Sequence, residues 1–466
     1  MKNLLLYLLV VFLGIQLVCG DDTPSLVIEL FRHGARSPSM SSVDPTWLDH
    51  DELTEVGIRQ HYILGKALAE QYPHLLGEYD ASKLYVRSTN YNRTLMSAFS
   101  QLSGIFEGKG PDITAAQAAS PDVMLPPFQD TELLQTIAKK LADNAAALPF
   151  KVQAIPIHSV DLNTDGLLYG GAGTCPNATN WYKQRTNDDN AQNAFTTLDS
   201  TTKYLNKLGF NIQQMYDYFP LGDALIADHM ANKILNKDIV YGTQYYNDIV
   251  FAHQWFVNYV YGGADISLQA FSYTLVNQLL DWFDGKANNT NPLNFIMLAC
   301  HDTTLLRLLG LFEITDPACL AKNRASQANG EKELPYPNCL YPTYASQILL
   351  EFYNPEGVEP YIKFIYNSKT INICGDKDTC SLTDFRNLAL KGVGLTPNQL
   401  TDLCNLPNTD PNTGEIIKIL LVTTVILVVI MLGLFASYVC LRKRMASTRG
   451  QDEYNRLSAD DATRRA

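Results

Sequence analysis

The sequence predicts an α/β fold: a mostly parallel sheet covered by helices on both faces, an inserted and mostly helical cap, and one C-terminal transmembrane helix. Three short apolar runs, at 25–31, 83–88 and 294–300, are each followed by a helical pattern. Strands that are apolar on both faces are typical of parallel sheets packed between helices. The stretch 160–290 differs in being rich in Asn, Asp and Tyr, and the run Ile419–Leu441 contains no charged residue.

The first 20 residues have the pattern of a secretory signal peptide. Lys2 precedes an apolar run from Leu4 to Leu17, and the small residue Gly20 completes a cleavage site. We therefore expect residues 1–20 to be a signal peptide and Asp21 to begin the mature chain. An uncleaved anchor is the alternative, but the run is short for a bilayer span of about 20 residues.

The globular body is expected over residues 21–404. Its first strand leads to Arg32 and is followed by a helical pattern at 53–72; its second leads to Arg87 and is followed by one at 92–106. The third strand leads to His301, which opens another helix. Residues of about 160–290 are expected to form the helical cap. Because ligands bind beyond the carboxyl ends of strands in open α/β sheets, we expect the polar residues at these three strand ends to converge.

The C-terminal part predicts a membrane anchor. Residues 405–415 form a stalk rich in Asn and Pro, and 416–441 are expected to form the transmembrane helix. The basic cluster 442–444 favours the cytoplasmic side, so the protein would span the membrane once with 442–466 as its cytoplasmic tail. The tail contains "YNRL". Tyr454 and Leu457 match a sorting signal read by clathrin adaptors, which bind such extended peptides through separate pockets.

Charge and cysteine spacing exclude some classes of partner. The formal net charge of −12 argues against nucleic acid. Of nine cysteines, Cys19 falls in the signal peptide and Cys440 in the predicted span. None of the others has metal-site spacing, so no metal site is expected. The sequence also has three Asn-X-Ser/Thr sites for glycosylation: Asn92, Asn177 and Asn288.

The residues at the strand ends predict phosphoryl chemistry. Three guanidinium groups, which bind phosphate oxygens by forked hydrogen bonds, are expected to surround one anion: Arg32, Arg36 and Arg87. His33 is the candidate nucleophile, and Gly34 would let its loop approach the anion closely. His301 could donate a further hydrogen bond. Asp302 could protonate the leaving oxygen and then activate water.

Each of these motifs has an ordinary structural alternative when taken singly. An arginine pair is usually a surface ion-pair partner, and Asp302 could be the N-cap of the helix that begins in "HDTTLLRLLGLF". The functional interpretation depends on their combination, because each cluster directly follows an apolar strand.

Taken together, the motifs resemble those of the histidine acid phosphatases, the second branch of the histidine phosphatase superfamily. "RHGARSP" matches the family signature RHGxRxP, and "YVRSTNYNRTLMSA" and "ACHDTTLLRLLGLF" resemble its two other conserved blocks. The similarity runs from about Leu26 to Cys404 and is strongest to lysosomal and prostatic acid phosphatases. It implies an acid phosphatase of phosphate monoesters that needs no metal or organic cofactor.

The resemblance also assigns roles. It implies His33 as the nucleophile and Asp302 as the proton donor. The phosphate-binding residues would be Arg32, Arg36, Arg87 and His301. A homodimer is an open possibility, and the lysosomal relatives, together with Tyr454 and Leu457, favour the membrane of a lysosome or acidic vacuole, reached by way of the plasma membrane.

Cysteine positions both follow and depart from the family. We expect Cys374–Cys380 to close a short loop, and Cys175–Cys404 to tie the cap region to the C-terminal segment as in the family. Cys319–Cys339 would bracket an apparent insertion, and Cys300 would remain a buried thiol. One disulfide of the animal relatives has no cysteine here, at positions near Ala224 and Gln347.

Narrower functions on the same scaffold stay open. The first is a lysophosphatidate phosphatase or a phytase, although the few basic residues in 160–290 argue against a phytase. The second is a mutase of the other branch, which uses Glu as its acid in a different context. The third is a catalytically inactive receptor, which the presence of every catalytic residue argues against.

Overall fold

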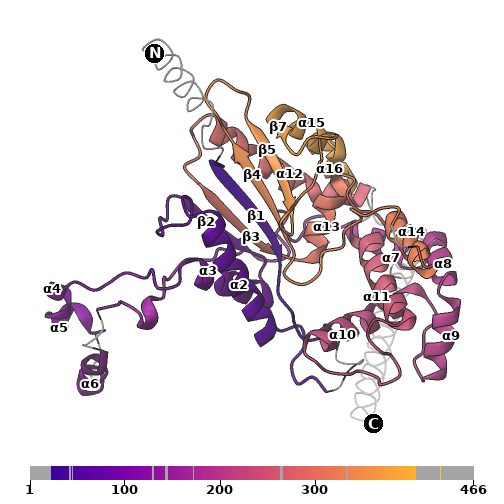
Figure 1. Ribbon diagram of the computed structural model, residues 1–466, viewed down its shortest axis with the longest axis horizontal. Coiled ribbons are helices and arrows are strands. Elements are labelled where there is room, and N and C mark those ends of the chain that lie inside the picture. Colours follow the sequence, from indigo (N-terminus) through magenta and orange to yellow (C-terminus); the bar gives the residue numbers. More distant parts are fainter. Residues whose placement is uncertain are drawn as a thin grey trace, which may run out of the picture. The chain divides into compact units, whose positions relative to one another are not determined.

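The structure is a computed structural model (Figure 1), and it describes residues 23–40, 44, 46–127, 131–141, 145–171, 173–262, 266–331, 334–405, 424 and 431. All the elements below lie in one compact unit, Met1–Asn405. The predicted signal peptide, stalk, transmembrane segment and tail, with Tyr454 and Leu457, fall outside the described residues, apart from Asn405, Thr424 and Met431. Among the described helices, none has the length and apolar character needed to cross a membrane.

A seven-stranded sheet forms the centre of the unit (Figure 1). Its strands are β1 (Leu26–Arg32), β2 (Leu84–Ser88), β3 (Phe295–Cys300), β4 (Gln347–Tyr353), β5 (Tyr361–Tyr366), β6 (Lys369–Thr370) and β7 (Cys380–Ser381). The strand order is β2-β3-β1-β4-β5-β6, with β7 also paired to β5. The three strands expected from the sequence are neighbours and run parallel.

The expectation of a mostly parallel sheet is wrong, because the sheet is mixed. β4 pairs antiparallel with β1, and β5 pairs antiparallel with β4, β6 and β7. The physical reason is local: β4 and β5 form a hairpin whose connection turns at Gly357 (φ +73°). Such a hairpin needs no crossover helix. The antiparallel half of the sheet therefore lacks the alternation of strands and helices that marks a parallel unit.

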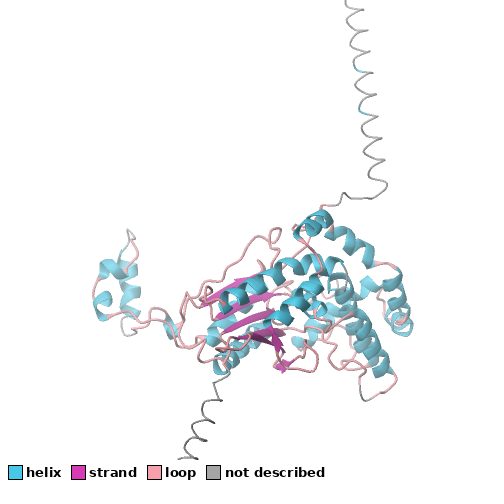
Figure 2. Ribbon diagram, turned by 90° about the horizontal axis from the view of Figure 1, so that it is seen from above, coloured by secondary structure: helices cyan, strands magenta, loops and turns pink. Residues whose placement is uncertain are grey.

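Helices cover both faces of the sheet, as expected (Figure 2). Side chains alternate along a strand, so Leu26, Ile28 and Leu30 of β1 face one way and Val27 and Phe31 the other, and all five are fully buried. The first set packs with α12 (Ile266–Ala287), α13 (Asp302–Leu311) and α15 (Leu382–Val393). The second packs with α2 (Glu55–Gln71) and α3 (Asn92–Ile105).

A separate apolar core holds the helical cap together. The cap contains α7 (Ala178–Thr186), α8 (Asp189–Thr196), α9 (Asp199–Lys207), η2 (Met215–Asp217), α10 (Tyr218–Met230), α11 (Gln244–Val257) and the turn η3 (Asn258–Gly262). The expected range of 160–290 extends too far, because α12 packs on the sheet. Conversely, α14 (Pro317–Ala328), from the apparent insertion, packs on α11 and so adds to the cap.

The remaining helices are short: four come between α3 and α7 in the sequence, and α16 follows α15. They are α4 (Ala115–Ala118), α5 (Pro121–Met124), α6 (Thr131–Leu141), η1 (Pro149–Lys151) and α16 (Pro397–Cys404). The three expected disulfides are present: Cys175–Cys404, Cys319–Cys339 and Cys374–Cys380. Cys300 is a buried free thiol at the end of β3, and burial raises its pKa to about 12.

One carboxyl group lies inside the sheet–helix core. Glu29 of β1 is fully buried, and Gln101 Nε2 donates to both of its oxygens, at 2.6 and 2.7 Å. The Gln101 carbonyl oxygen in turn accepts from His61 Nδ1 at 2.9 Å. Burial raises the pKa of Glu29 to about 8, although the hydrogen bond from Gln101 acts in the opposite direction. Glu29 is therefore protonated in the folded protein at acid pH.

This raised pKa predicts that the protein loses stability as the pH rises from about 4.5 to about 8. Within that window the folded state holds a proton that the unfolded chain has lost, so the free energy of unfolding falls with increasing pH. Glu29→Gln, which mimics the protonated group, should reduce this fall by at least ~1 kcal/mol in urea unfolding.

Glu78→Gln serves as the control, since Glu78 is exposed on the surface. The prediction fails if Glu29→Gln and the wild type show the same dependence of unfolding free energy on pH.

Candidate active site

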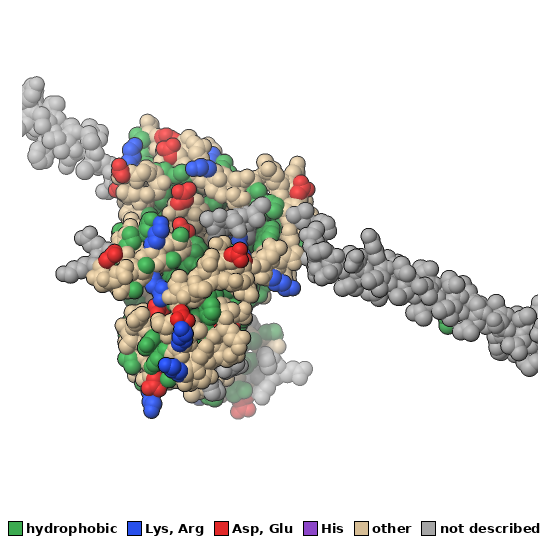
Figure 3. All heavy atoms as spheres, turned by 90° about the vertical axis from the view of Figure 1, so that its right-hand side faces the viewer, with side chains coloured by type: hydrophobic (Ala, Val, Ile, Leu, Met, Phe, Trp, Pro, Cys, Tyr) green, Lys and Arg blue, Asp and Glu red, His purple; other side chains and the backbone are tan. Residues whose placement is uncertain are grey.

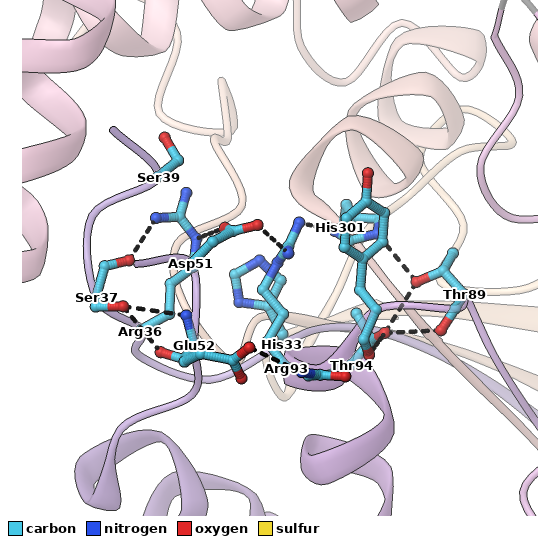
Figure 4. Close-up of polar contacts among 12 residues, drawn as sticks. His33, Arg36, Ser37, Ser39, Asp51, Glu52, Thr89, Arg93, Thr94 and His301 are labelled. Carbon is cyan, nitrogen blue, oxygen red and sulfur yellow. Dashed lines mark hydrogen bonds and ion pairs between the residues drawn. The ribbon is translucent and has the colours of Figure 1, made fainter. Parts of the chain in front are cut away.

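The pairing of β1 with β3 brings two histidines together. Arg32 lies opposite Cys300 in this parallel pair, so the next residue of each strand, His33 and His301, leaves the sheet at the same edge. Their ring centroids are 5.7 Å apart, and both side chains are buried. Figure 4 shows His33 lying between Arg36 on one side and Arg93 and His301 on the other.

The hydrogen bonding of His33 fixes which ring nitrogen is basic. Nδ1 lies 2.9 Å from the carbonyl oxygen of Gly34. A carbonyl can only accept, so Nδ1 carries the hydrogen and Nε2 keeps its lone pair. Nε2 is the atom available to attack an electrophile.

The surroundings of His33 keep the imidazole neutral. Burial and then the positive charges of Arg93, Arg32 and Arg36 lower the pKa of His33 well below its usual value. The pKa of His301 is lowered in the same way, by burial and by Arg93, Arg32, Arg36 and Arg307. A histidine with a lowered pKa stays unprotonated in acid, so its lone pair remains available there.

Backbone contacts hold the loop after β1 in place. Gly34 N donates to Ser97 Oγ at 3.1 Å, and Ala35 N donates to Gln60 Oε1 at 2.9 Å. A Cβ on Gly34 would lie 2.5 Å from the carbonyl oxygen of Gly57, in the first turn of α2. The close packing of this loop on α2 therefore requires the glycine.

Each of the two arginines in this loop has a carboxylate partner. Arg36 forms a forked pair with Asp223 of α10, at 2.8 and 3.1 Å, and its Nε lies 3.4 Å from Asp51. Arg32 Nη2 lies 2.9 Å from Asp302 Oδ2, and its guanidinium stacks on the ring of Tyr344 at 4.5 Å. Both arginines are thus held in position by carboxylates of the protein.

The expectation for Arg87 needs correction. Arg87 lies within β2, where its Nη2 contacts Asp165 Oδ1 at 2.5 Å, and it does not line the cavity around His33. Arg93, in the first turn of α3, occupies the expected place. Its Nη2 lies 3.5 Å from His301 Nδ1, and its Nη1 lies 2.5 Å from Asp51 Oδ2.

A sequence signal for Arg93 did exist. β2 ends at Ser88, so only the residues after Ser88 lie beyond the edge of the sheet. The second arginine of "RSTNYNRT" therefore lies nearer the ligand edge, at a helix N-terminus.

His301 and Asp302 begin α13. His301 Nε2 lies 3.0 Å from Thr89 Oγ1, so Nδ1 faces Arg93 and the cavity. His301, and not Asp302, occupies the N-cap position, and it makes no side-chain cap hydrogen bond. Asp302 Oδ1 accepts from Thr303 N at 2.8 Å, and Tyr341 OH lies 3.4 Å from Oδ2. The N-cap alternative for Asp302 is therefore wrong.

A cavity of about 530 Å³ opens above these groups, between the sheet edge and the cap. Its polar floor includes His33, Arg36, Arg93, His301 and Asp302. Its walls are largely aromatic and come mainly from the cap and the loop before it: Tyr91, Tyr169, Tyr182, Phe219 and Tyr261. Sequence reasoning did not identify these wall residues or the carboxylates Asp51 and Asp223. Within the described ranges, no three His, Cys, Asp or Glu side chains are arranged to hold a metal ion.

The charge of Arg93 gives a direct test of this electrostatic arrangement. After burial, the charge of Arg93 is the largest cause of the lowered pKa of His33, so Arg93→Met should raise that pKa, measured without added phosphate. Arg93→Lys keeps the charge and should leave the His33 titration close to that of the wild type. The measurement is an NMR titration of labelled histidine, with His33 assigned by the loss of its signals in His33→Ala. An unchanged pKa in Arg93→Met would refute the argument.

Comparison with known proteins identifies the family. A model of the histidine phosphatase superfamily (branch 2) matches residues 43–367. The lysosomal acid phosphatase of Xenopus laevis is 26% identical over 380 residues, covering 77% of this chain and 74% of its own. The prostatic acid phosphatase of Bos taurus is 24% identical over 378 residues, covering 77% and 82%.

Solved structures support the same fold. The phytase from D. castellii matches with a TM-score of 0.51 and 15% identity, covering 80% of each chain. The phytase from Citrobacter braakii matches with a TM-score of 0.50 and 13% identity, covering 79% of this chain and 98% of its own. The protein therefore belongs to branch 2 of the histidine phosphatase superfamily, and it is a phosphatase.

Proposed function

We propose that the protein hydrolyses phosphate monoesters at acid pH through a phosphohistidine intermediate on His33. The observation that carries this proposal is the hydrogen bond from His33 Nδ1 to the Gly34 carbonyl, since it leaves Nε2 as the nucleophile. The lowered pKa of His33 keeps that atom unprotonated at the pH of an acidic compartment. The acid phosphatase names of the curated relatives support the same activity.

The first step transfers the phosphoryl group to the enzyme. Nε2 forms a bond to phosphorus while the bond from phosphorus to the leaving oxygen breaks. Asp302 gives its proton to that oxygen, and the alcohol departs. The phosphoryl oxygens are held by Arg32, Arg36, Arg93 and His301, whose charges and hydrogen bonds stabilise the transition state.

The second step releases phosphate. Asp302, now ionised, takes a proton from a water molecule as that water attacks phosphorus, and the bond to Nε2 breaks. Inorganic phosphate leaves, and both His33 and Asp302 return to their starting states. No cofactor is required, because arginines supply the positive charge.

Two substitutions separate the proposed roles. His33→Ala should abolish turnover of p-nitrophenyl phosphate without loss of folding, because it removes the nucleophile. Asp302→Asn should slow an alkyl phosphate far more than p-nitrophenyl phosphate, since nitrophenolate departs with little protonation. Steady-state kcat for both substrates, together with acid-labile phosphoenzyme trapping, provides the measurement.

His74→Ala is the matched control, as His74 is an exposed histidine of the surface. Turnover by His33→Ala above a few per cent of the wild-type rate would overturn the nucleophile assignment. Equal losses for the two substrates in Asp302→Asn would overturn the proton-donor assignment.

We further propose that the protein is a glycosylated, single-pass membrane protein of lysosomes or acidic vacuoles. The charge-free run Ile419–Leu441 and the basic cluster after it support the anchor. Asn92 and Asn288 are exposed; Asn177 is half-buried, and its Nδ2 donates to the Leu403 carbonyl at 3.1 Å. The proteins named lysosomal acid phosphatase support the location.

The proposed signal at Tyr454 and Leu457 predicts a change of location on mutation. Tyr454→Ala should shift the protein to the plasma membrane with an unchanged catalytic rate, because adaptor binding requires the tyrosine pocket to be filled. Asn455→Ala, at a variable position of the motif, should behave as the wild type. Surface biotinylation compared with vacuolar fractionation measures the shift. Normal delivery of Tyr454→Ala to the acidic compartment would exclude this signal.

A further inference from the structure

One arginine of the active-site cavity has no carboxylate partner. Three arginines line the cavity: Arg36, Arg93 and Arg307. The first two pair with Asp223 and Asp51. For Arg307, no carboxylate among the described residues lies within ion-pair distance; its backbone acceptors are the carbonyls of Tyr169, at 2.6 Å, and Tyr261, at 3.5 Å.

The guanidinium of Arg307 is fixed in place on the cavity wall. It lies over the ring of Phe271 at 4.6 Å, and it hydrogen-bonds the hydroxyl of Tyr182. Gly170 (φ +56°) packs so closely that a Cβ there would lie 2.9 Å from Arg307 Nη1. A guanidinium has five N–H donors, so acceptors on the protein account for only about three of them.

Burial without a counter-ion makes this charge costly. The side chain is 5% exposed, and burial lowers the pKa of its guanidinium. A buried charge is normally paired, because removing it from water without a partner is energetically unfavourable. A bound anion would supply the missing partner.

The position of Arg307 relates that anion to the reaction. Arg307 follows Asp302 by five residues in α13, which places it about 7.5 Å further along the helix axis. Tyr169, whose carbonyl it holds, has its ring 6.0 Å from that of His301. The phosphoryl group itself would occupy the floor beside His33, so an anion at Arg307 must belong to the leaving group.

We propose that Arg307 and the Tyr182 hydroxyl form a second anion subsite, which selects phosphate monoesters whose leaving group carries a carboxylate or a second phosphate. The spacing suits a leaving group that extends several bonds from the ester oxygen, and the tyrosine walls suit one with a planar or aromatic body. This inference rests on the proposed phosphatase mechanism at His33.

Selection would act inside the cavity rather than over the surface. On the face that carries the cap helices, acidic and basic side chains are interspersed (Figure 3). A surface of this kind gives little long-range attraction for a polyanion. One buried arginine therefore favours a single extra anionic group over a highly phosphorylated substrate.

The test compares isosteric substrates. The wild type should hydrolyse 4-carboxyphenyl phosphate with a kcat/KM about tenfold or more above that of neutral 4-carbamoylphenyl phosphate, at about pH 5.5, where the carboxylate is ionised. A third substrate, 1,4-phenylene bisphosphate, distinguishes a phosphate preference from a carboxylate preference. The advantage should appear mainly in KM.

Arg307→Gln should remove most of that preference, Arg307→Lys should retain part of it, and Tyr182→Phe should weaken it. Arg185→Gln is the matched control. Arg185 is also a buried arginine that donates to the carbonyls of the same turn, at Tyr259 and Val260, but it does not line the cavity. It should leave the ratio of the two rates unchanged.

Equal kcat/KM values of the wild type for 4-carboxyphenyl phosphate and 4-carbamoylphenyl phosphate would overturn the proposed subsite, whatever the variants show. Equal losses on both substrates in Arg307→Gln would show a purely structural role and overturn it too. Failure of the wild type to hydrolyse any of the three esters would instead refute the proposed function.

Discussion

The parallel pairing of β1 with β3 is the constraint on which the site depends. With Arg32 opposite Cys300, the two polar segments that follow must leave the sheet side by side. A shift of one residue would exchange the two faces of β1 and move Leu26, Ile28 and Leu30 out of the core they share with α12, α13 and α15. The apolar packing on both faces therefore fixes the register of β1 against β3. That register in turn sets the spacing between His33 and His301.

The second constraint is electrostatic. Arg32, Arg36 and Arg93 are crowded around one imidazole, which would be unfavourable without nearby negative charge. Asp223 and Asp51 supply that charge to Arg36 and Arg93. These carboxylates hold the guanidinium groups in place, while burial and the guanidinium charges lower the pKa of His33. The proposed phosphate site is thus held together by ion pairs within the protein.

Sequence reasoning identified the parts that follow from local pattern. The strands leading to Arg32 and His301 are continuous apolar runs, and their ends gave His33, His301 and Asp302. It missed the antiparallel half because β4 and β5 carry no helix between them. It named Arg87 and did not consider Arg93, because Arg93 lies in the first turn of the next helix and not at the strand end. Asp223 reaches the site only through tertiary packing, which has no signature in local spacing.

An ion pair attaches the cap to the loop after β1. It joins Asp223 of α10 to Arg36. Next to Ala224, Asp223 accepts hydrogen bonds from both terminal nitrogens of Arg36 and from the backbone N and the hydroxyl of Ser39. Burial alone would raise the pKa of Asp223, but the ion pair with Arg36 holds it well below the usual range, so the link stays charged in acid.

This ionic link joins the cap to the loop that carries His33. The link passes through Arg36, a residue proposed to bind the phosphoryl group, so the same guanidinium contacts the cap and would contact the proposed substrate. Asp223 occupies the edge of the guanidinium formed by its two terminal nitrogens, and Asp51 lies 3.4 Å from Nε on the other edge. The position of the cap and the proposed recognition of phosphate therefore depend on a single side chain, Arg36. A substitution of Asp223 would change the geometry of the reacting centre by displacing Arg36.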